Sequence, residues 1–245
     1  MSIVFTDCTY RYKRRHQPVL TNFSYQVPDG LTILLGPNGA GKSTLLRLGA
    51  SVIQPQSGRI TCDTIASTAR EYRRHVSWMP QQITPVAGLT AREQVSYAGW
   101  LKGMSRRDAW DHALGALTKV GLQDRADDKA KTLSGGQLRR VGVAAALMHD
   151  CRVLLLDEPT AGMDPTQRRV FRDLLATAVG TSQLSILMST HDVADLTDDA
   201  DHITVLSQGH IRFDGVPHQF LRNAPADTSA ARHAEAAYTA LTSHG

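Results

Sequence analysis

Short apolar runs recur along the chain and alternate with longer segments of mixed apolar and polar residues. The runs at 31–35, 153–156 and 184–188 are almost entirely apolar. Runs of this kind form strands of parallel sheets, because helices cover both faces of such a sheet and bury it. Polar residues follow these runs, at the edge where ligands bind in α/β sheets. The pattern therefore predicts an α/β protein with a mainly parallel sheet core flanked by helices.

The remaining patterns divide the chain further. Alternating or short apolar stretches predict strands at 3–10, 19–27, 59–65 and 75–79, and a hairpin through 203–206 and 210–213. Helical patterns and start signals predict helices at about 43–50, 90–104, 105–120, 138–148 and 166–178, and a charged segment at 70–74. We expect one domain over 1–220, with a helical subdomain of about 82–148 inserted in the core. The Ala-rich tail, 221–245, is expected to hold a short helix.

A glycine-rich stretch follows the apolar run at 31–35. It has the spacing Gly, four residues, Gly-Lys-Ser/Thr of a phosphate-binding loop and consists of Gly36, Pro37, Asn38, Gly39, Ala40, Gly41, Lys42, Ser43 and Thr44. A strand before it and a helix after it give the required context, because the helix N-terminus directs N–H groups at an anion. Lys42 is expected to reach the β- and γ-phosphates, and Ser43 to hold Mg²⁺. The alternative is a glycine turn that binds nothing.

Two carboxylates and a histidine stand at the ends of later apolar runs. Asp157 and Glu158 follow the run at 153–156, and His191 follows the run at 184–188. Asp157 is placed to hold Mg²⁺ through water, and Glu158 to accept a proton from an attacking water. Both carboxylates can also be plain turn residues. The position of His191 favours a polar contact with phosphate over a core histidine.

Two further polar groups have local interpretations as well as functional ones. Ser134 and Gln137 have capping-box spacing, and Gly135 and Gly136 between them expose N–H groups at a helix start. This arrangement predicts a second anion-binding site, or simply an ordinary N-cap. Gln81 follows the strand at 75–79, where its amide oxygen can ligate Mg²⁺ or have no ligand at all.

Composition excludes some classes of protein. The chain has 245 residues, of which 42% are hydrophobic and 20% charged, as in an ordinary globular domain. No stretch approaches the ~18 apolar residues of a membrane-spanning helix, and no apolar signal segment opens the chain, so we expect a cytosolic protein. Cys8, Cys62 and Cys151 lack metal-ligand spacing and are expected to be reduced thiols. The net charge of +4 is mild and is compatible with nucleic acid, a membrane surface or no charged partner.

A basic run that contains aromatic residues lies at 10–16. Such a run can touch nucleic acid, but a single short one is more often a solvated loop, so no nucleic acid is expected. One of its tyrosines can stack on a nucleotide base. By position, Tyr12 is favoured over Tyr10.

Taken together and in this order, the motifs resemble the ATP-binding subunit of an ABC transporter, over residues 3 to about 220. The matching parts are the phosphate-binding loop 36–44, Tyr12 as base-stacking aromatic, Gln81 of the Q-loop, the signature Leu133–Gln137, Asp157 with Glu158 as catalytic carboxylate, Met163-Asp164 of the D-loop and His191 as switch histidine. The resemblance implies ATP and Mg²⁺ as cofactors and a small antiparallel β region. It also implies a head-to-tail homodimer or heterodimer. Ser134, Gly135, Gly136, Gln137 and Asp164 then complete the site that the other chain's loop begins.

The segments 88–93, 98–103 and 235–241 resemble the drug and peptide export branch, which includes lantibiotic and multidrug exporters. We therefore expect an exporter ATPase on the inner face of the cell membrane, with a membrane-spanning permease docked near 82–104. The ATPase of an importer is the alternative. A soluble ABC ATPase of DNA repair or translation is a further alternative, but such a protein usually has two ATPase halves or a long coiled insertion. A P-loop kinase is a third alternative, but it would not need Leu133–Gln137 or His191.

Overall fold

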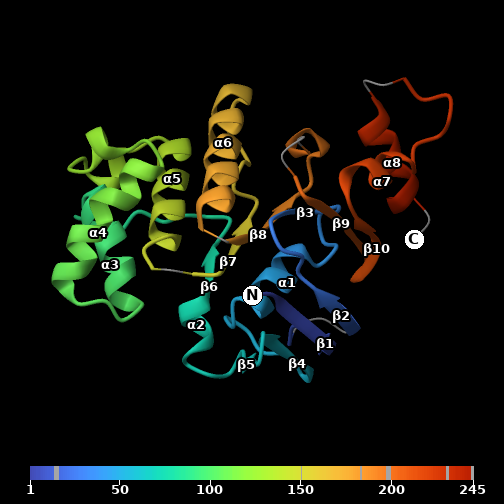
Figure 1. Cartoon of the computed structure of the whole chain (residues 1–245), viewed down its shortest axis with the longest axis horizontal. Helices are drawn as coiled ribbons and strands as arrows, with labels where there is room; N and C mark the ends of the chain where they lie inside the picture. Colours follow the sequence, from blue (N-terminus) through green and yellow to red (C-terminus); the bar gives the residue numbers. More distant parts are fainter. Residues whose placement is uncertain (14–16, 150, 183, 197–199, 230–231, 244–245) are drawn as a thin grey trace.

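The computed structural model describes residues 1–13, 17–149, 151–182, 184–196, 200–229 and 232–243, with the side chains of 178–182 left out. The basic run at 10–16 is therefore described only as far as Lys13, and its last three residues lie outside the described part. Within this part the chain forms two sheets with helices around them (Figure 1).

The larger sheet has six strands in the order β10-β9-β3-β8-β7-β6 among the described residues. Its strands are β3 (Leu31–Leu35), β6 (Val76–Met79), β7 (Val153–Asp157), β8 (Ser185–Thr190), β9 (His202–Ser207) and β10 (His210–Gly215). All neighbours are parallel except β9 and β10, which form the predicted hairpin. The mainly parallel sheet core is thus confirmed.

Helices and a second sheet bury this sheet on both faces. Every residue of β3, β7 and β8 is buried. Successive side chains of a strand point to opposite faces. Ile33 and Leu35 therefore pack in one core with residues of the large helices, whereas Leu34 packs in a second core with α1 and the smaller sheet. This double burial explains why the runs contain so few polar residues.

The smaller sheet is antiparallel, with the strand order β2-β1-β4-β5. Its strands are β1 (Ile3–Tyr10), β2 (Leu20–Gln26), β4 (Ser57–Cys62) and β5 (Ile65–Ala66). The single strand predicted at 59–65 is wrong. The chain turns at Asp63, which has a φ of 49° and whose N–H donates to the carbonyl of Ser2 at 3.1 Å.

Helices lie at both ends of the molecule, with the two sheets between them (Figure 1). At one end lie α3 (Ala91–Leu101), α4 (Arg106–Lys119) and α5 (Gly135–Ala146). At the other end α7 (Pro217–Leu221) and α8 (His233–Thr242) lie beside β9 and β10. Between these two ends lie α1 (Lys42–Gly49) and α6 (Pro165–Ser182). The described residues also form the 3₁₀ turns η1 (Gln123–Arg125), η2 (Ala130–Thr132) and η3 (Val193–Asp195).

Some helix boundaries differ from the predicted ones for physical reasons. Helix α5 begins at Gly135, ahead of the predicted range 138–148, because Ser134 is its N-cap, as its capping-box spacing predicts, and the glycines form its first turn. The charged segment at 70–74 overlaps the short helix α2 (Tyr72–His75). It forms around Tyr72, a fully buried side chain whose hydroxyl donates to the carbonyl of Gly49 at 2.6 Å. In the described part of the chain, no helix has the length and apolar character needed to cross a membrane.

Candidate nucleotide-binding site

The phosphate-binding loop is a tight turn between β3 and α1. Gly41 is the N-cap of α1 and has a φ of 111°, in a region that L side chains rarely adopt. At Gly36 a Cβ would lie 2.2 Å from the carbonyl oxygen of Leu206 in β9, so only glycine fits there. Lys42 folds back over the loop and donates to the carbonyls of Gly36 at 2.6 Å and Pro37 at 3.2 Å. Burial lowers the pKa of Lys42, and the nearby carboxylates oppose this effect.

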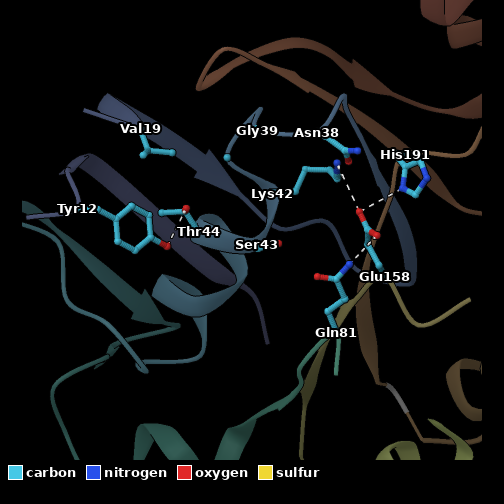
Figure 2. A pocket seen from close by; sticks show the side chains of 11 residues that line it. Tyr12, Val19, Asn38, Gly39, Lys42, Ser43, Thr44, Gln81, Glu158 and His191 are labelled. Carbon is cyan, nitrogen blue, oxygen red and sulfur yellow. Dashed lines mark hydrogen bonds and ion pairs between the residues drawn. The ribbon is translucent and has the colours of Figure 1, made fainter. Parts of the chain in front are cut away.

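Four segments that lie far apart in the sequence meet at the carboxylate of Glu158 (Figure 2). Its Oε2 accepts a hydrogen bond from Nε2 of Gln81 at 3.0 Å, and its Oε1 lies 3.2 Å from Nδ1 of His191. The ammonium of Lys42 is 3.9 Å from the same Oε1. The backbone of Glu158 has a φ of 47°, and its N–H donates to Oγ of Ser189 at 3.0 Å. An uncommon backbone conformation thus places the carboxylate where these three side chains converge.

Asp157, one residue earlier, is only 1% exposed and faces the start of α1. Its Oδ1 accepts hydrogen bonds from the hydroxyls of Ser43 at 2.9 Å and Ser189 at 3.0 Å. Burial raises its pKa, and the two serine hydrogen bonds oppose the shift. The carboxylate of Asp157, the hydroxyl of Ser43 and the amide oxygen of Gln81 are hard donors of the kind that Mg²⁺ prefers, so these residues could hold it.

The described residues hold no cluster of three or more His, Cys, Asp or Glu that can bind a metal. Mg²⁺ commonly uses one or two carboxylates and completes its shell with water and substrate phosphates.

A cavity of about 530 Å³ opens over this cluster. Its lining residues are Tyr12, Val19, Asn38, Gly39, Gly41, Lys42, Ser43, Thr44, Gln81, Glu158 and His191. The hydroxyl of Tyr12 lies 3.2 Å from Oγ1 of Thr44, and its ring meets the ring of Tyr10 edge-on at 5.0 Å between centroids. Of the two tyrosines, Tyr12 therefore lines the cavity. Val19 also lines the cavity and was not predicted as a site residue; it is the first residue of the strand predicted at 19–27 and directly precedes the observed strand β2.

The signature residues lie elsewhere and do not line this cavity. Oγ of Ser134 accepts from the N–H of Gln137 at 3.3 Å, and Oε1 of Gln137 accepts from the N–H of Ser134 at 2.9 Å, which completes a capping box. Gly135 has open space where a Cβ would stand. The exposed residue Asp164 accepts from the N–H of Gln167 at 2.9 Å in the first turn of α6, and it too lies outside the cavity lining.

Two residues that the sequence reasoning missed support the cluster from behind. Ser189 bonds both Asp157 and the backbone of Glu158, as described above. Arg139 in α5 donates to the carbonyls of Glu158 at 3.0 Å and Pro159 at 3.4 Å, and burial lowers its pKa. The helix that begins with the signature therefore contacts the loop that carries Glu158.

A glycine-rich loop after a central strand, with a carboxylate pair at the end of a nearby parallel strand, defines a P-loop nucleotide hydrolase. The family model described as "ABC transporter" matches residues 20–161. The chain belongs to this family: it is an ABC ATPase subunit of a transporter. The predicted family and its fold are confirmed.

Relatives support the same assignment over most of the chain. The phosphonates import ATP-binding protein PhnC 2 of Synechococcus sp. is 36% identical over 216 residues, which cover 82% of this chain and 80% of the relative. The linearmycin resistance ATP-binding protein LnrL of Bacillus subtilis is 32% identical, over 79% of this chain and 63% of the relative. The relatives thus include proteins named for import and for drug resistance, and they do not single out the export branch.

Solved structures agree with the fold. A bacterial ABC transporter cassette, determined as a dimer, superposes with a TM-score of 0.78 at 26% identity, covering 87% of this chain and 98% of the cassette. A post-hydrolysis state of that cassette, bound to ADP and Pi, gives the same TM-score of 0.78.

Proposed function

We propose that the cavity holds ATP and that the chain hydrolyses it with the residues that meet there. Lys42 and the N–H groups of the loop bind the phosphates, while Tyr12 stacks on the base. The observation that carries the proposal is the convergence of Lys42, Gln81 and His191 on the carboxylate of Glu158. A carboxylate held by polar groups from three separate segments fits a general base that orients a nucleophilic water beside a terminal phosphate.

Within this site each residue has a distinct task. Glu158 accepts the proton of the attacking water, and His191 contacts the terminal phosphate. Ser43, Asp157 and Gln81 would hold Mg²⁺, which when bound neutralises charge on the phosphate oxygens. Turnover by purified Glu158→Gln and His191→Ala variants tests these tasks, because both should bind ATP and hydrolyse it slowly.

We also propose that two ATPase subunits share each nucleotide. Ser134 to Gln137 present N–H groups at the N-terminus of a helix, yet they lie outside the cavity lining of their own chain. An exposed helix start that leaves room for an anion fits a phosphate brought by another subunit. Asp164 would join the same interface. A twofold dimer then contains two equivalent sites. The cassette with a similar fold was itself determined as a dimer.

A membrane-spanning partner would dock on the helical end of the chain. A groove of about 430 Å³ lies there, lined by Leu89, Glu93, Ser96, Tyr97, Trp100, Arg106 and Trp110. Trp100 is 44% exposed and Val86 39% exposed. Exposed aromatic side chains around a hollow are typical of protein interfaces. Gln81 bonds Glu158, and the chain from Gln81 leads to this groove, so a helix of the membrane partner bound in the groove would respond to the nucleotide. This docking would hold the chain at the inner face of the cell membrane.

Cross-linking from single cysteines at Val86 and Trp100 to the membrane partner tests this docking. The native residues Cys8, Cys62 and Cys151 are buried, so added thiols should react first. A cysteine at Leu221, which is 40% exposed on α7 at the other end, is the matched control. Links from 86 and 100 but not from 221 support the docking, whereas links from 221 alone contradict it.

For the direction of transport we propose export, supported by the segments 88–93 and 98–103 and by the likeness to the linearmycin resistance protein. Import is the second candidate, because the relative at 36% identity is named for phosphonate import. Deleting the gene from its host separates the two. Loss of growth on methylphosphonate as sole phosphorus source favours import, whereas sensitivity to linearmycin with normal phosphonate growth favours export.

A further inference from the structure

The loops that carry Glu158 and His191 leave neighbouring parallel strands, β7 and β8. The side chain of His191 is 48% exposed. Packing therefore restrains it little, and its position depends on how the backbone of its loop is fixed. The groups that join this loop to the one after Glu158 decide whether the two side chains meet.

A buried carboxylate joins the two loops. Asp195 in η3 is 1% exposed, and its Oδ2 accepts hydrogen bonds from Thr160 at 2.8 Å and Thr190 at 2.5 Å. Thr160 lies two residues after Glu158, and Thr190 lies one residue before His191. One carboxylate oxygen thus holds both loops at a fixed separation.

Arg168 of α6 supplies the positive charge beside this carboxylate. Its Nη1 lies 3.8 Å from Oδ1 of Asp195 and donates to Oδ2 of Asp192 at 2.5 Å. Its Nε donates to the carbonyl of Met163 at 3.2 Å. Oδ1 of Asp195 is buried and has no hydrogen-bond partner among the described residues, so Arg168 is the countercharge it faces. Loss of Arg168 would leave this buried carboxylate without its countercharge, which is strongly destabilising.

We propose that Asp195 and Arg168 are positioning residues, which fix the distance between Glu158 and His191. Through the bond from Arg168 to Met163 they also couple this distance to the loop at Met163. The inference rests on the proposed tasks of Glu158 and His191. Neither Arg168 nor Asp195 lines the nucleotide cavity. Their loss should therefore slow hydrolysis and leave ATP binding almost unchanged.

Steady-state hydrolysis by Arg168→Gln is the first test. We expect kcat to fall by roughly 10- to 100-fold, because misplacing a reacting group by about 1 Å costs up to about 10²-fold. KM and the Kd for ATP should change by less than about threefold. Arg169→Gln, on the exposed neighbour in the same helix, is the matched control and should turn over like the parent. Thr160→Val keeps every charge and removes one bond to Asp195, so it should lower kcat by about threefold or more while remaining folded.

A double-mutant cycle with His191→Ala separates positioning from a general loss of structure. If Arg168 acts through His191, then Arg168→Gln should slow the His191→Ala variant by less than about twofold. The inference would be overturned if the losses in kcat of Arg168→Gln and His191→Ala multiplied in the double variant, or if Arg168→Gln and Thr160→Val both kept the parental kcat. In either case a slow His191→Ala variant would still uphold the proposed function. Parental turnover of His191→Ala itself would overturn both.

Discussion

Replacing Glu158 with glutamine removes one negative charge and keeps the shape of the side chain. The amide oxygen can still accept the hydrogen bond that Glu158 receives from Gln81 at 3.0 Å, so the cluster should keep its geometry. The amide cannot take a proton from water. Loss of a general base typically slows a reaction by about 10²–10⁴-fold, and we expect hydrolysis by Glu158→Gln to fall within this range.

The same change should leave ATP binding at least as tight as in the parent. Lys42 lies 3.9 Å from Glu158, and its side chain is 5% exposed while that of Glu158 is 12% exposed. At this distance and an effective dielectric of about 20, the gross attraction is about 4 kcal/mol, much of it offset by desolvation. Glutamine ends this attraction, so Lys42 no longer divides its charge between a carboxylate and the phosphates.

ATP hydrolysis and ATP binding are measured side by side on purified parent, Glu158→Gln and Glu235→Gln. Glu235 is exposed on α8, at the opposite end from the large helical group, and serves as the matched control. We expect slow turnover with undiminished affinity in Glu158→Gln only. Near-parental turnover would remove Glu158 from the proton transfer, and lost affinity would refute the idea that its charge competes with phosphate for Lys42.

Two further substitutions probe the strand end and the loop. Burial raises the pKa of Asp157 above its ordinary 3.8, so the folded state loses stability as pH rises through that higher value. Asp157→Asn should therefore raise the thermal unfolding temperature of the nucleotide-free chain near pH 7, with no gain below about pH 3.8. A gain in unfolding temperature that persists at acid pH would contradict this cause. Gly36→Ala places a Cβ 2.2 Å from the carbonyl of Leu206 and should weaken ATP binding at least about tenfold. Calorimetric titration checks this, with Gly115→Ala, whose Cβ meets open space on α4, as control.

The parts of the fold that follow directly from the sequence are those where one physical cause dominates. Strands buried on both faces are almost entirely apolar, so β3 and β7 are recognisable from the sequence. Capping residues fix helix starts locally, as Thr90 does for α3 and Ser134 for α5. The turn at Asp63 was missed because a non-glycine residue adopts its positive φ, which the letters do not reveal.

The site divides in the same way. Residues that follow a strand or begin a helix, such as Lys42 and Glu158, are predictable from their positions. Residues that act by packing from a distant element are not. Arg139 reaches Glu158 from another helix, and Asp195 joins two loops through hydroxyl groups. Nothing in the local sequence around either residue indicates these contacts.

The shared site between two subunits is the central claim, and mixing two inactive variants tests it most directly. Lys42→Ala disables the loop, Ser134→Arg disables the signature, and each should be nearly inactive alone. If the site forms between subunits, about half of a random mixture is mixed dimers, each with one intact site, and roughly a quarter of parental hydrolysis returns when one site suffices. ATP-driven dimerisation is measured in the same mixture, since it reports an intact site even if hydrolysis requires both sites of the dimer to be active. Recovered hydrolysis or recovered ATP-driven dimers uphold the account, whereas a mixture that shows neither contradicts it.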